Sequence, residues 1–374
     1  GTAPGKQALA TLRGFDANLD LRLGALVSGL RTWRDLRLRL GVKDGQVALK
    51  TLRVEDVVGV DVRVRGDIDL NQTAPLLSLD FAGGSARLDR LAGYLGESWR
   101  RPLRQIGAAR VRGRITGAAA AATLETAFEG IGGRAKLTAP VDLTAGLLRG
   151  PGSIEIEHPE VATLVGLWND AWPLAKRSVG PGRLAVRLTP RDDDRHNLRL
   201  DLRAGEMTMA LAGTMGRLRQ LWPLDLTFDI RHPRALGLVR QVTENWRPRG
   251  EDIGRLALGG RFSGDNTVFQ VSGLSLTAGA SVLTGAINYA EGARPRVDAQ
   301  LTASQLTPLE WLPAAGIAAL WPARDRLNRW LTAVDGDLTL AVTDLAVGGA
   351  TGGTSWHDAL LEADLSEGVL TVRR

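Results

Sequence analysis

The fold is decided by stretches such as Leu224-Asp225-Leu226-Thr227-Phe228-Asp229-Ile230, in which apolar and polar residues alternate one by one. Successive side chains of a β-strand point to opposite faces, so this period places one face in an apolar environment and the other in water. The same alternation recurs at residues 19–23, 36–40, 60–65, 68–70, 154–157 and 198–202. It predicts a mostly β protein.

Turn signals separate these strands at short spacing. Examples are Lys43-Asp44-Gly45, Ser263-Gly264-Asp265-Asn266 and Glu367-Gly368. Such Asp-, Asn- and Gly-rich sequences between alternating strands are typical of β-hairpins. We therefore expect mostly antiparallel pairing.

Composition limits the classes of protein to consider. The chain has 374 residues, which is more than a domain with one compact core usually contains. Of these residues 44% are hydrophobic and 24% are charged, and this composition is not typical of a disordered protein. It contains no cysteine, which excludes disulfides and thiol chemistry. The net charge of +6 comes from 47 Lys and Arg against 41 Asp and Glu. The basic residues alternate with Leu and Val, as on a solvated sheet face, so we expect no nucleic-acid partner.

Several features repeat along the chain. His158-Pro159 and His232-Pro233 lie 74 residues apart, and each precedes a helix-like segment. A further helix-like segment opens near Leu306-Thr307-Pro308. These features predict an antiparallel repeat array with one short helix per repeat of roughly 73 residues. The expected repeats are residues 1–105, 106–178, 179–250 and 251–332, and residues 333–374 start a further repeat.

The two ends of the chain also resemble each other. Asp35 and Asp44-Gly45 correspond to Asp358 and Glu367-Gly368, each 323 residues later. The chain thus begins its opening repeat again near its end. We expect it to be a segment of a longer repeating protein.

These patterns together resemble the repeating unit of the AsmA-like proteins. The likeness covers essentially the whole chain. It rests on the strand at residues 36–40 with the Asp-Gly turn and Val47-Ala48-Leu49 after it, and on residues 274–312 with the closing Leu309-Glu310-Trp311-Leu312-Pro313. The motifs are degenerate, so their regular spacing carries more weight than any one of them.

The resemblance implies a fold and a function. Members of the family are anchored in the bacterial inner membrane by one N-terminal helix and extend through the periplasm. They are similar to repeating β-groove, bridge-like lipid transfer proteins. For this chain the resemblance implies a periplasmic location and a curled or taco-like groove for phospholipid or another acyl lipid. The groove would carry acyl chains between inner and outer membrane and support outer-membrane biogenesis. No stretch approaches the roughly 18 apolar residues of a spanning helix, so we expect the anchor outside this segment.

The apolar face of a single curled sheet also predicts a ligand on physical grounds. Exposed apolar surface costs about 25 cal/mol per Å², and large exposed patches mark binding sites. The clearest candidates for lipid-binding positions are the apolar members of the alternating strands: Leu19, Leu21, Leu23, Val60, Val62, Val64, Leu198, Leu200, Leu202, Leu224, Leu226, Phe228, Leu338 and Leu340.

The same alternation fits a second class of protein. In a closed β-solenoid or sandwich the apolar faces cover each other, and the chain would be a scaffold for envelope assembly without a ligand. A groove predicts inward apolar side chains without a protein partner and lipid that co-purifies. A scaffold predicts a dry, packed core.

The residues of an active site are not evident. The four histidines lack metal-ligand spacing, and we expect His158 and His232 to have local capping or packing roles. Asp192-Asp193-Asp194 lacks the calcium-loop spacing and is expected to be a solvated hairpin turn. Phosphate-binding and nucleophile motifs are missing, and the carboxylates are spread too evenly for a polysaccharide-cleaving enzyme. We expect no enzyme, catalytic residue, metal or cofactor.

Overall fold

The computed structural model describes most of the chain: residues 16–28, 31–57, 60–72, 74–91, 100–144, 147–148, 152–168, 173–176, 178–193, 195–217, 220–235, 254–308, 332–347 and 354–373. The chain divides into two compact units. The N-terminal unit comprises Gly1–Asp170 and Gly182–Leu188, and the C-terminal unit comprises Ala171–Pro181 and Thr189–Arg374. Both units are built mostly of β-strands, as predicted.

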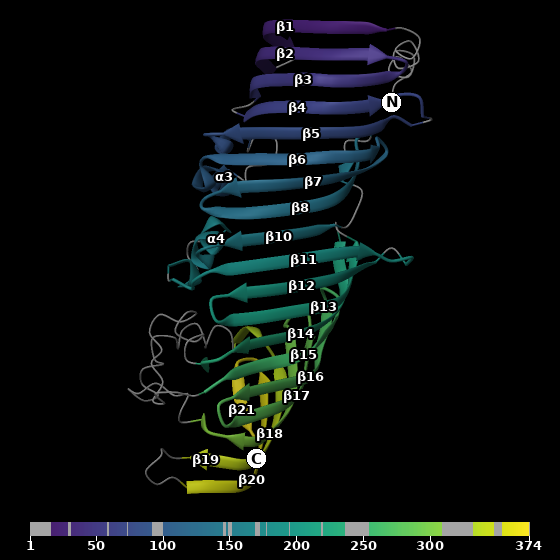
Figure 1. The fold of residues 1–374 in the computed structure, drawn as a ribbon. Helices are drawn as coiled ribbons and strands as arrows, with labels where there is room; N and C mark the ends of the chain where they lie inside the picture. Colours follow the sequence, from purple (N-terminus) through teal and green to yellow (C-terminus); the bar gives the residue numbers. More distant parts are fainter. Residues whose placement is uncertain are drawn as a thin grey trace. The chain divides into compact units, whose positions relative to one another are not determined.

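The N-terminal unit is an open antiparallel sheet whose strands follow one another in chain order (Figure 1). β10 continues the sheet by pairing with β8, and β11 pairs with β10. Among the described strands β1 pairs only with β2, so the sheet is open at this edge. The strands are β1 (Ala17–Ser28), β2 (Arg31–Lys43), β3 (Gln46–Val57), β4 (Val60–Asp69), β5 (Leu76–Ser85), β6 (Ala109–Ala118), β7 (Ala121–Gly130), β8 (Gly133–Asp142), β9 (Leu147–Leu148), β10 (Ser153–His158) and β11 (Gly182–Pro190).

The C-terminal unit is a second run of strands paired in chain order, and among the described strands β21 pairs only with β20. One pair departs from the antiparallel prediction, because β18 and β19 are parallel. The long connection between them allows the chain to return to the same end of the sheet. The strands are β12 (His196–Ala204), β13 (Met207–Arg217), β14 (Gln220–His232), β15 (Leu256–Gly264), β16 (Val268–Ala278), β17 (Ser281–Ala290), β18 (Arg296–Leu306), β19 (Gly336–Val347), β20 (Thr354–Ser366) and β21 (Val369–Val372).

The predicted turns join the strands where expected. In the β2–β3 hairpin Lys43 pairs with Gln46, and the two turn residues Asp44 and Gly45 have φ of 49° and 70°. Positive φ at both positions is the mark of a type I′ turn, whose twist matches that of the strands. Glu367-Gly368 forms the equivalent turn between β20 and β21, with φ of 52° and 80°.

The described helices are short. They are η1 (Leu88–Leu91), α3 (Arg100–Ile106), α4 (Val161–Trp168) and η3 (Pro173–Lys176). The helix expected after His232-Pro233, and most of the one expected after Leu306-Thr307-Pro308, lie outside the described residues. No helix in the described part of the chain has the length and apolar character needed to cross a membrane.

Two buried clusters of the N-terminal unit lie at opposite ends of the strands. One joins Leu88 of η1 and Leu103 of α3 to Ala109, at the start of β6. The other joins Val42, Val47 and Leu70 around the β2–β3 turn. The middle of the apolar face lies between these clusters, and most of its side chains are only half-buried.

Candidate functional site

Apolar side chains of the N-terminal unit line up across the strands. Leu21 lies opposite Leu38, and the same register continues through every strand from β1 to β11 except the two-residue β9. Partners in register share a face of the sheet. This apolar row consists of Leu21, Leu38, Leu52, Val64, Phe81, Gly113, Thr126, Leu137, Ile154 and Val186.

Phe81 keeps this row continuous at its glycine. A Cβ atom on Gly113 would lie 2.5 Å from Phe81 Cζ, so the aromatic ring lies over the glycine. The ring thus supplies the apolar surface that Gly113 lacks. A second row on the same face contains Val62, which lies opposite Val54 and Gly83.

The C-terminal unit has an equivalent row through nine strands. It runs across β12 to β20 and passes through the parallel β18–β19 pair without changing face. The row consists of Leu198, Gly213, Leu226, Phe262, Val271, Ile287, Ala299, Leu338 and Ala363. On the same face Leu200 and Phe228 lie opposite Leu211, and Leu340 lies between Leu301 and Leu361.

The predicted lipid-binding positions thus lie on the apolar faces of the two units, and most are half-buried. This group comprises Leu21, Leu23, Val60, Val62, Val64, Leu198, Leu200, Leu202, Leu224, Phe228, Leu338 and Leu340. Leu226 is buried, with 8% of its surface exposed, whereas Leu19 near the open edge is 43% exposed. Neighbouring side chains within the same sheet cover only part of each of these side chains.

Most side chains of the two apolar rows are half-buried and not fully enclosed. In a β-sandwich the side chains of the two inner faces interdigitate and form a packed core. The described side chains of the apolar rows therefore lack the enclosure of such a core.

An aromatic ladder in the C-terminal unit was not predicted from the sequence. The ring centroids of Trp222 and Phe262 lie 5.9 Å apart, those of Phe262 and Phe269 lie 5.1 Å apart, and those of Phe269 and Tyr289 lie 4.5 Å apart. These residues come from four strands, and only the register brings them together. The alternation within each strand identified apolar positions, but it could not predict that these four aromatic rings come together.

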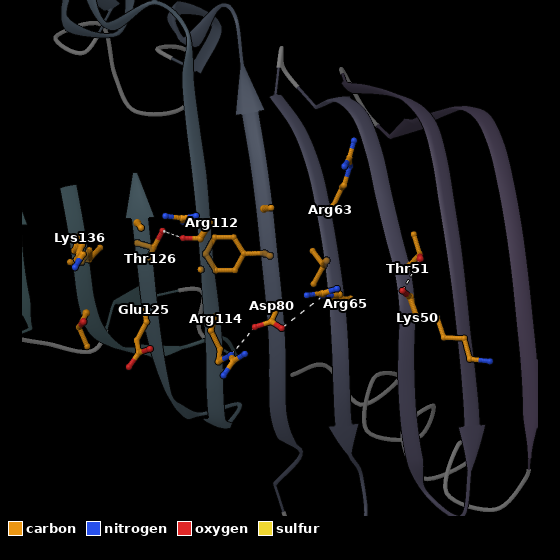
Figure 2. A pocket seen from close by; sticks show the side chains of 17 residues that line it. Lys50, Thr51, Arg63, Arg65, Asp80, Arg112, Arg114, Glu125, Thr126 and Lys136 are labelled. Carbon is orange, nitrogen blue, oxygen red and sulfur yellow. Dashed lines mark hydrogen bonds and ion pairs between the residues drawn. The ribbon is translucent and has the colours of Figure 1, made fainter. Parts of the chain in front are cut away.

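The N-terminal unit carries a hollow of about 890 Å³ across β3 to β8 (Figure 2). Its lining contains members of the apolar row, among them Val64 and Gly113, and residues that flank them, as Arg63 and Arg65 flank Val64 and as Arg112 and Arg114 flank Gly113. Because neighbours along a strand point to opposite faces, the charged residues of the lining lie on the polar side of the sheet. Its charged lining residues are Lys50, Arg63, Arg65, Arg112, Arg114 and Lys136, against the carboxylates of Asp80 and Glu125.

The charges in this hollow are only partly paired. Asp80 lies 2.7 Å from Arg114 Nε and 3.9 Å from Arg65 Nε. The hydrogen bond from Arg114 lowers the pKa of Asp80 and raises the pKa of the arginine. Among the described residues, no carboxylate lies within ion-pair distance of Lys50, Arg63 or Lys136. We name this site the cationic hollow.

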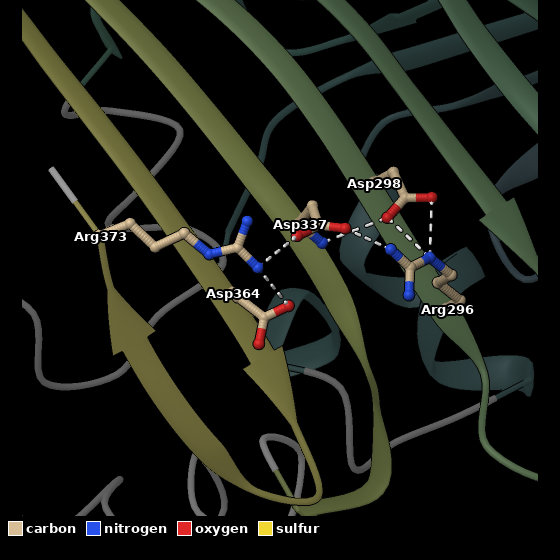
Figure 3. Close-up of polar contacts among 5 residues, drawn as sticks. All are labelled: Arg296, Asp298, Asp337, Asp364 and Arg373. Carbon is tan, nitrogen blue, oxygen red and sulfur yellow. Dashed lines mark hydrogen bonds and ion pairs between the residues drawn. The ribbon is translucent and has the colours of Figure 1, made fainter.

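On the C-terminal unit the charges form a closed network (Figure 3). Arg296 contacts Asp298 and Asp337, and Arg373 lies 3.9 Å from Asp337 and 3.4 Å from Asp364. The backbone nitrogen of Asp337 also donates to Asp298 Oδ1 at 3.1 Å. We name these five residues the aspartate network; it joins the parallel β18–β19 pair to β20 and β21.

Arg294 and Asp335 strengthen the same joint. Arg294 Nε and Nη2 donate to the Asp335 carboxylate at 2.9 to 3.0 Å. The backbone nitrogen of Glu367 donates to Asp335 Oδ1 at 3.0 Å. The arginine and this backbone hydrogen bond lower the pKa of Asp335.

The two expected local histidines are both buried. Nδ1 of His158 accepts a hydrogen bond from Glu160 N at 2.9 Å, and Nδ1 of His232 accepts one from Arg234 N at 3.1 Å. Nε2 of His158 lies 2.9 Å from the carbonyl oxygen of Ile131, whereas Nε2 of His232 is buried without a partner. Both imidazoles thus order the turn that follows their strand.

The remaining acidic candidates are surface groups. Asp192 and Asp193 are exposed between β11 and β12, where Asp193 accepts from Arg195 N at 3.3 Å; Asp194 lies outside the described residues. Within the described part of the chain, no group of three or more His, Asp or Glu side chains is arranged to hold a metal ion. Comparison with protein-family models, curated proteins and solved structures found no match to the chain.

Proposed function

We propose that the apolar faces bind lipid acyl chains, as part of an AsmA-like periplasmic protein that carries lipid between inner and outer membrane. The observations that support this are the apolar row in each unit and the half-burial of most of its side chains. An acyl chain on such a row removes apolar surface from water at about 25 cal/mol per Å². Moving along the row exchanges one apolar surface for another at little cost.

We also propose that the chain is a repeat array with a period of about 73 residues. Left-handed glycines support this period: Gly107, Gly180 and Gly254 have φ of 67°, 92° and 80°. Gly132, Gly205 and Gly279 form a second such series, with φ of 82°, 57° and 62°. The matching Nδ1 hydrogen bonds of His158 and His232 follow the same spacing.

A scaffold for envelope assembly is the second candidate function. It requires a packed, dry core, and the half-burial of most side chains in the apolar rows favours the lipid groove over this candidate. A scaffold without a ligand would also leave the exposed part of half-buried leucines, such as Leu200 and Leu340, in contact with water.

Native mass spectrometry of the purified chain, followed by organic extraction, tests the proposal. We expect bound phospholipid in roughly stoichiometric amounts. A stable monomer free of lipid would contradict the groove and favour the scaffold.

A matched pair of variants locates the binding face. Leu340→Asp places a charge on the apolar face, whereas Thr339→Asp places the same charge at the exposed neighbouring position on the opposite face. We expect Leu340→Asp to lose bound lipid while circular dichroism shows the sheet intact, and Thr339→Asp to retain it. Equal lipid content in the two variants would show that this face does not bind acyl chains.

A further inference from the structure

We propose that the polar face of the N-terminal unit binds a soluble, extended polyanion that carries phosphate groups. The proposal does not rest on lipid binding, because it concerns the opposite face of the sheet. It rests on one row of side chains in cross-strand register and on the cationic hollow that this row enters.

The row contains six cations and no carboxylate from β1 to β8, and it continues on β10 with Glu155, which lies opposite Lys136. Its members, from β1 to β8, are Arg22, Arg37, Arg53, Arg63, Ala82, Arg112, Ala127 and Lys136. Like charges directly opposite each other in a sheet are destabilising. Four arginines on four adjacent strands are therefore a cost to the fold that a bound anion would offset.

Carboxylates from neighbouring positions neutralise only part of this row. Asp20 lies 3.6 Å from Arg22, Glu55 lies 2.6 Å from Arg53, and Glu129 lies 3.4 Å from Arg112. Arg37, Arg63 and Lys136 have no such partner among the described residues. Arg53 Nε is buried without a hydrogen-bond partner even though its other nitrogen pairs with Glu55.

The alanines in the row leave space for the anion. Ala82 separates Arg63 from Arg112, and Ala127 separates Arg112 from Lys136. Strands two apart are about 10 Å from each other, so each alanine forms the floor of a gap between two cations. A phosphate in such a gap can accept hydrogen bonds from both sides, and guanidinium groups bind phosphate in a bidentate manner.

The chemistry of this face favours a phosphate chain over other polyanions. The cationic hollow offers mainly charged, hydroxyl and small side chains. Its large apolar lining residues, Val64, Phe81 and Leu137, belong to the apolar row, whose side chains alternate with the charged ones along each strand. Nucleobases need aromatic side chains to stack on, and an acidic peptide would leave its apolar side chains without pockets. Asp80 and Glu125 oppose any anion, but Asp80 is already paired with Arg114.

Isothermal titration of the full chain with inorganic polyphosphate tests the proposal. We expect saturable binding that weakens between about 50 and about 200 mM salt, because counterions are released. The double variant Arg63→Gln/Arg112→Gln should weaken binding by about tenfold or more. It should also reduce the slope of log K against log salt by about two.

Arg199→Gln/Arg231→Gln is the matched control, because it removes the same charge from the C-terminal unit. There Arg199 lies 3.1 Å from Asp201 and Arg231 lies 2.8 Å from Asp229. We expect this control to bind polyphosphate like the parent chain. Equal weakening in both double variants, or no saturable binding by the parent, would overturn the proposal.

Sedimentation with phosphatidylglycerol vesicles separates the two sources of phosphate. We expect little binding to the vesicles at the salt concentration where polyphosphate binds. Vesicle binding that needs Arg63 and Arg112, without binding of free polyphosphate, would overturn the assignment to a soluble chain.

Discussion

The polar faces of the two units are built from the same alternating strands but differ in how their charges meet. In one row of the N-terminal unit, arginines lie opposite arginines, and Arg37 and Arg63 have no carboxylate within ion-pair distance among the described residues. In the C-terminal unit Asp337 lies opposite Asp364 and beside Asp298, yet each of the three carboxylates contacts Arg296 or Arg373. One face is open to an anion, and the other is internally satisfied.

This difference teaches that charge along a strand does not determine charge on a surface. The residue that faces a given side chain comes from another strand, so the register decides whether it is a partner or a like charge. The packing of the apolar faces depends less on register, because an apolar side chain can pack against any apolar neighbour. The following predictions test which features the units share and which separate them.

The largest effect is expected where a charge enters the shared apolar face at a buried position. Leu226→Asp should destabilise the C-terminal unit by about 3 to 4 kcal/mol, because the charge would be buried without a partner. Leu200→Asp should cost about 1 kcal/mol, since Leu200 is half-buried and its replacement can reach water. Urea unfolding measures both, and equal small effects would contradict the assigned faces.

A smaller difference in stability is expected between substitutions of the two buried histidines, His158 and His232. His158→Phe should cost about 2 kcal/mol, because it leaves the Ile131 carbonyl and the Glu160 amide without partners. His232→Phe should cost about 1 kcal/mol less, since Nε2 has no partner to lose. Hydrogen exchange at β10 and β14 compares the two sites, and a larger loss at His232 would contradict this ranking.

Acid should affect the paired charges of the C-terminal unit. The pKa values of Asp225 and Asp335 are lowered by their arginine partners, so their stabilisation is present above the unfolded pKa of about 3.9. It is lost as pH falls through the lowered folded pKa. Asp335→Asn should lower Tm by a few degrees at pH 7 and reduce this acid sensitivity. Thermal melts between pH 7 and 3 measure both, and an unchanged pH profile would refute the role of Asp335.

The smallest change in Tm is expected for a substitution on the polar face of the N-terminal unit. Arg63→Gln should leave Tm unchanged or raise it by about 1 °C, because it relieves repulsion from the opposing Arg53. Arg261→Gln should instead lower Tm, since Arg261 makes two hydrogen bonds of 2.6 Å to Asp225. Thermal unfolding of this pair compares the faces directly, and a clear loss on Arg63→Gln would mean that its charge is already satisfied.

Much of the fold could be predicted because its signals are local. Alternation at residues 198–202 and 224–230 placed Leu198 and Leu226 on one face, and the structure aligns them in one row. Asp44-Gly45 predicted its hairpin turn because these residues accept positive φ. The parallel β18–β19 pair was not predicted, because its connection carries no signal of where the chain returns.

The candidate sites divide in the same way. The apolar positions were predicted strand by strand, whereas the aromatic ladder and the cationic row were not. Register shifts explain this limit: bulges between Leu49 and Leu52 and between Val271 and Leu274 change which residues face each other. One such shift moves every later side chain along its strand relative to the neighbour.

The sequence by itself determined the strands, their turns and the division of each strand into an apolar and a polar face. These properties depend on backbone geometry within a few residues, where the alternation of side chains has a period of two. Only the tertiary structure decided that most side chains of the apolar rows stay half-buried. It also decided that one polar row of the N-terminal unit sets arginines opposite arginines, whereas the aspartate network of the C-terminal unit brings arginines to aspartates. Those outcomes depend on neighbours about 5 Å away across the sheet, which come from other strands and are brought there by register.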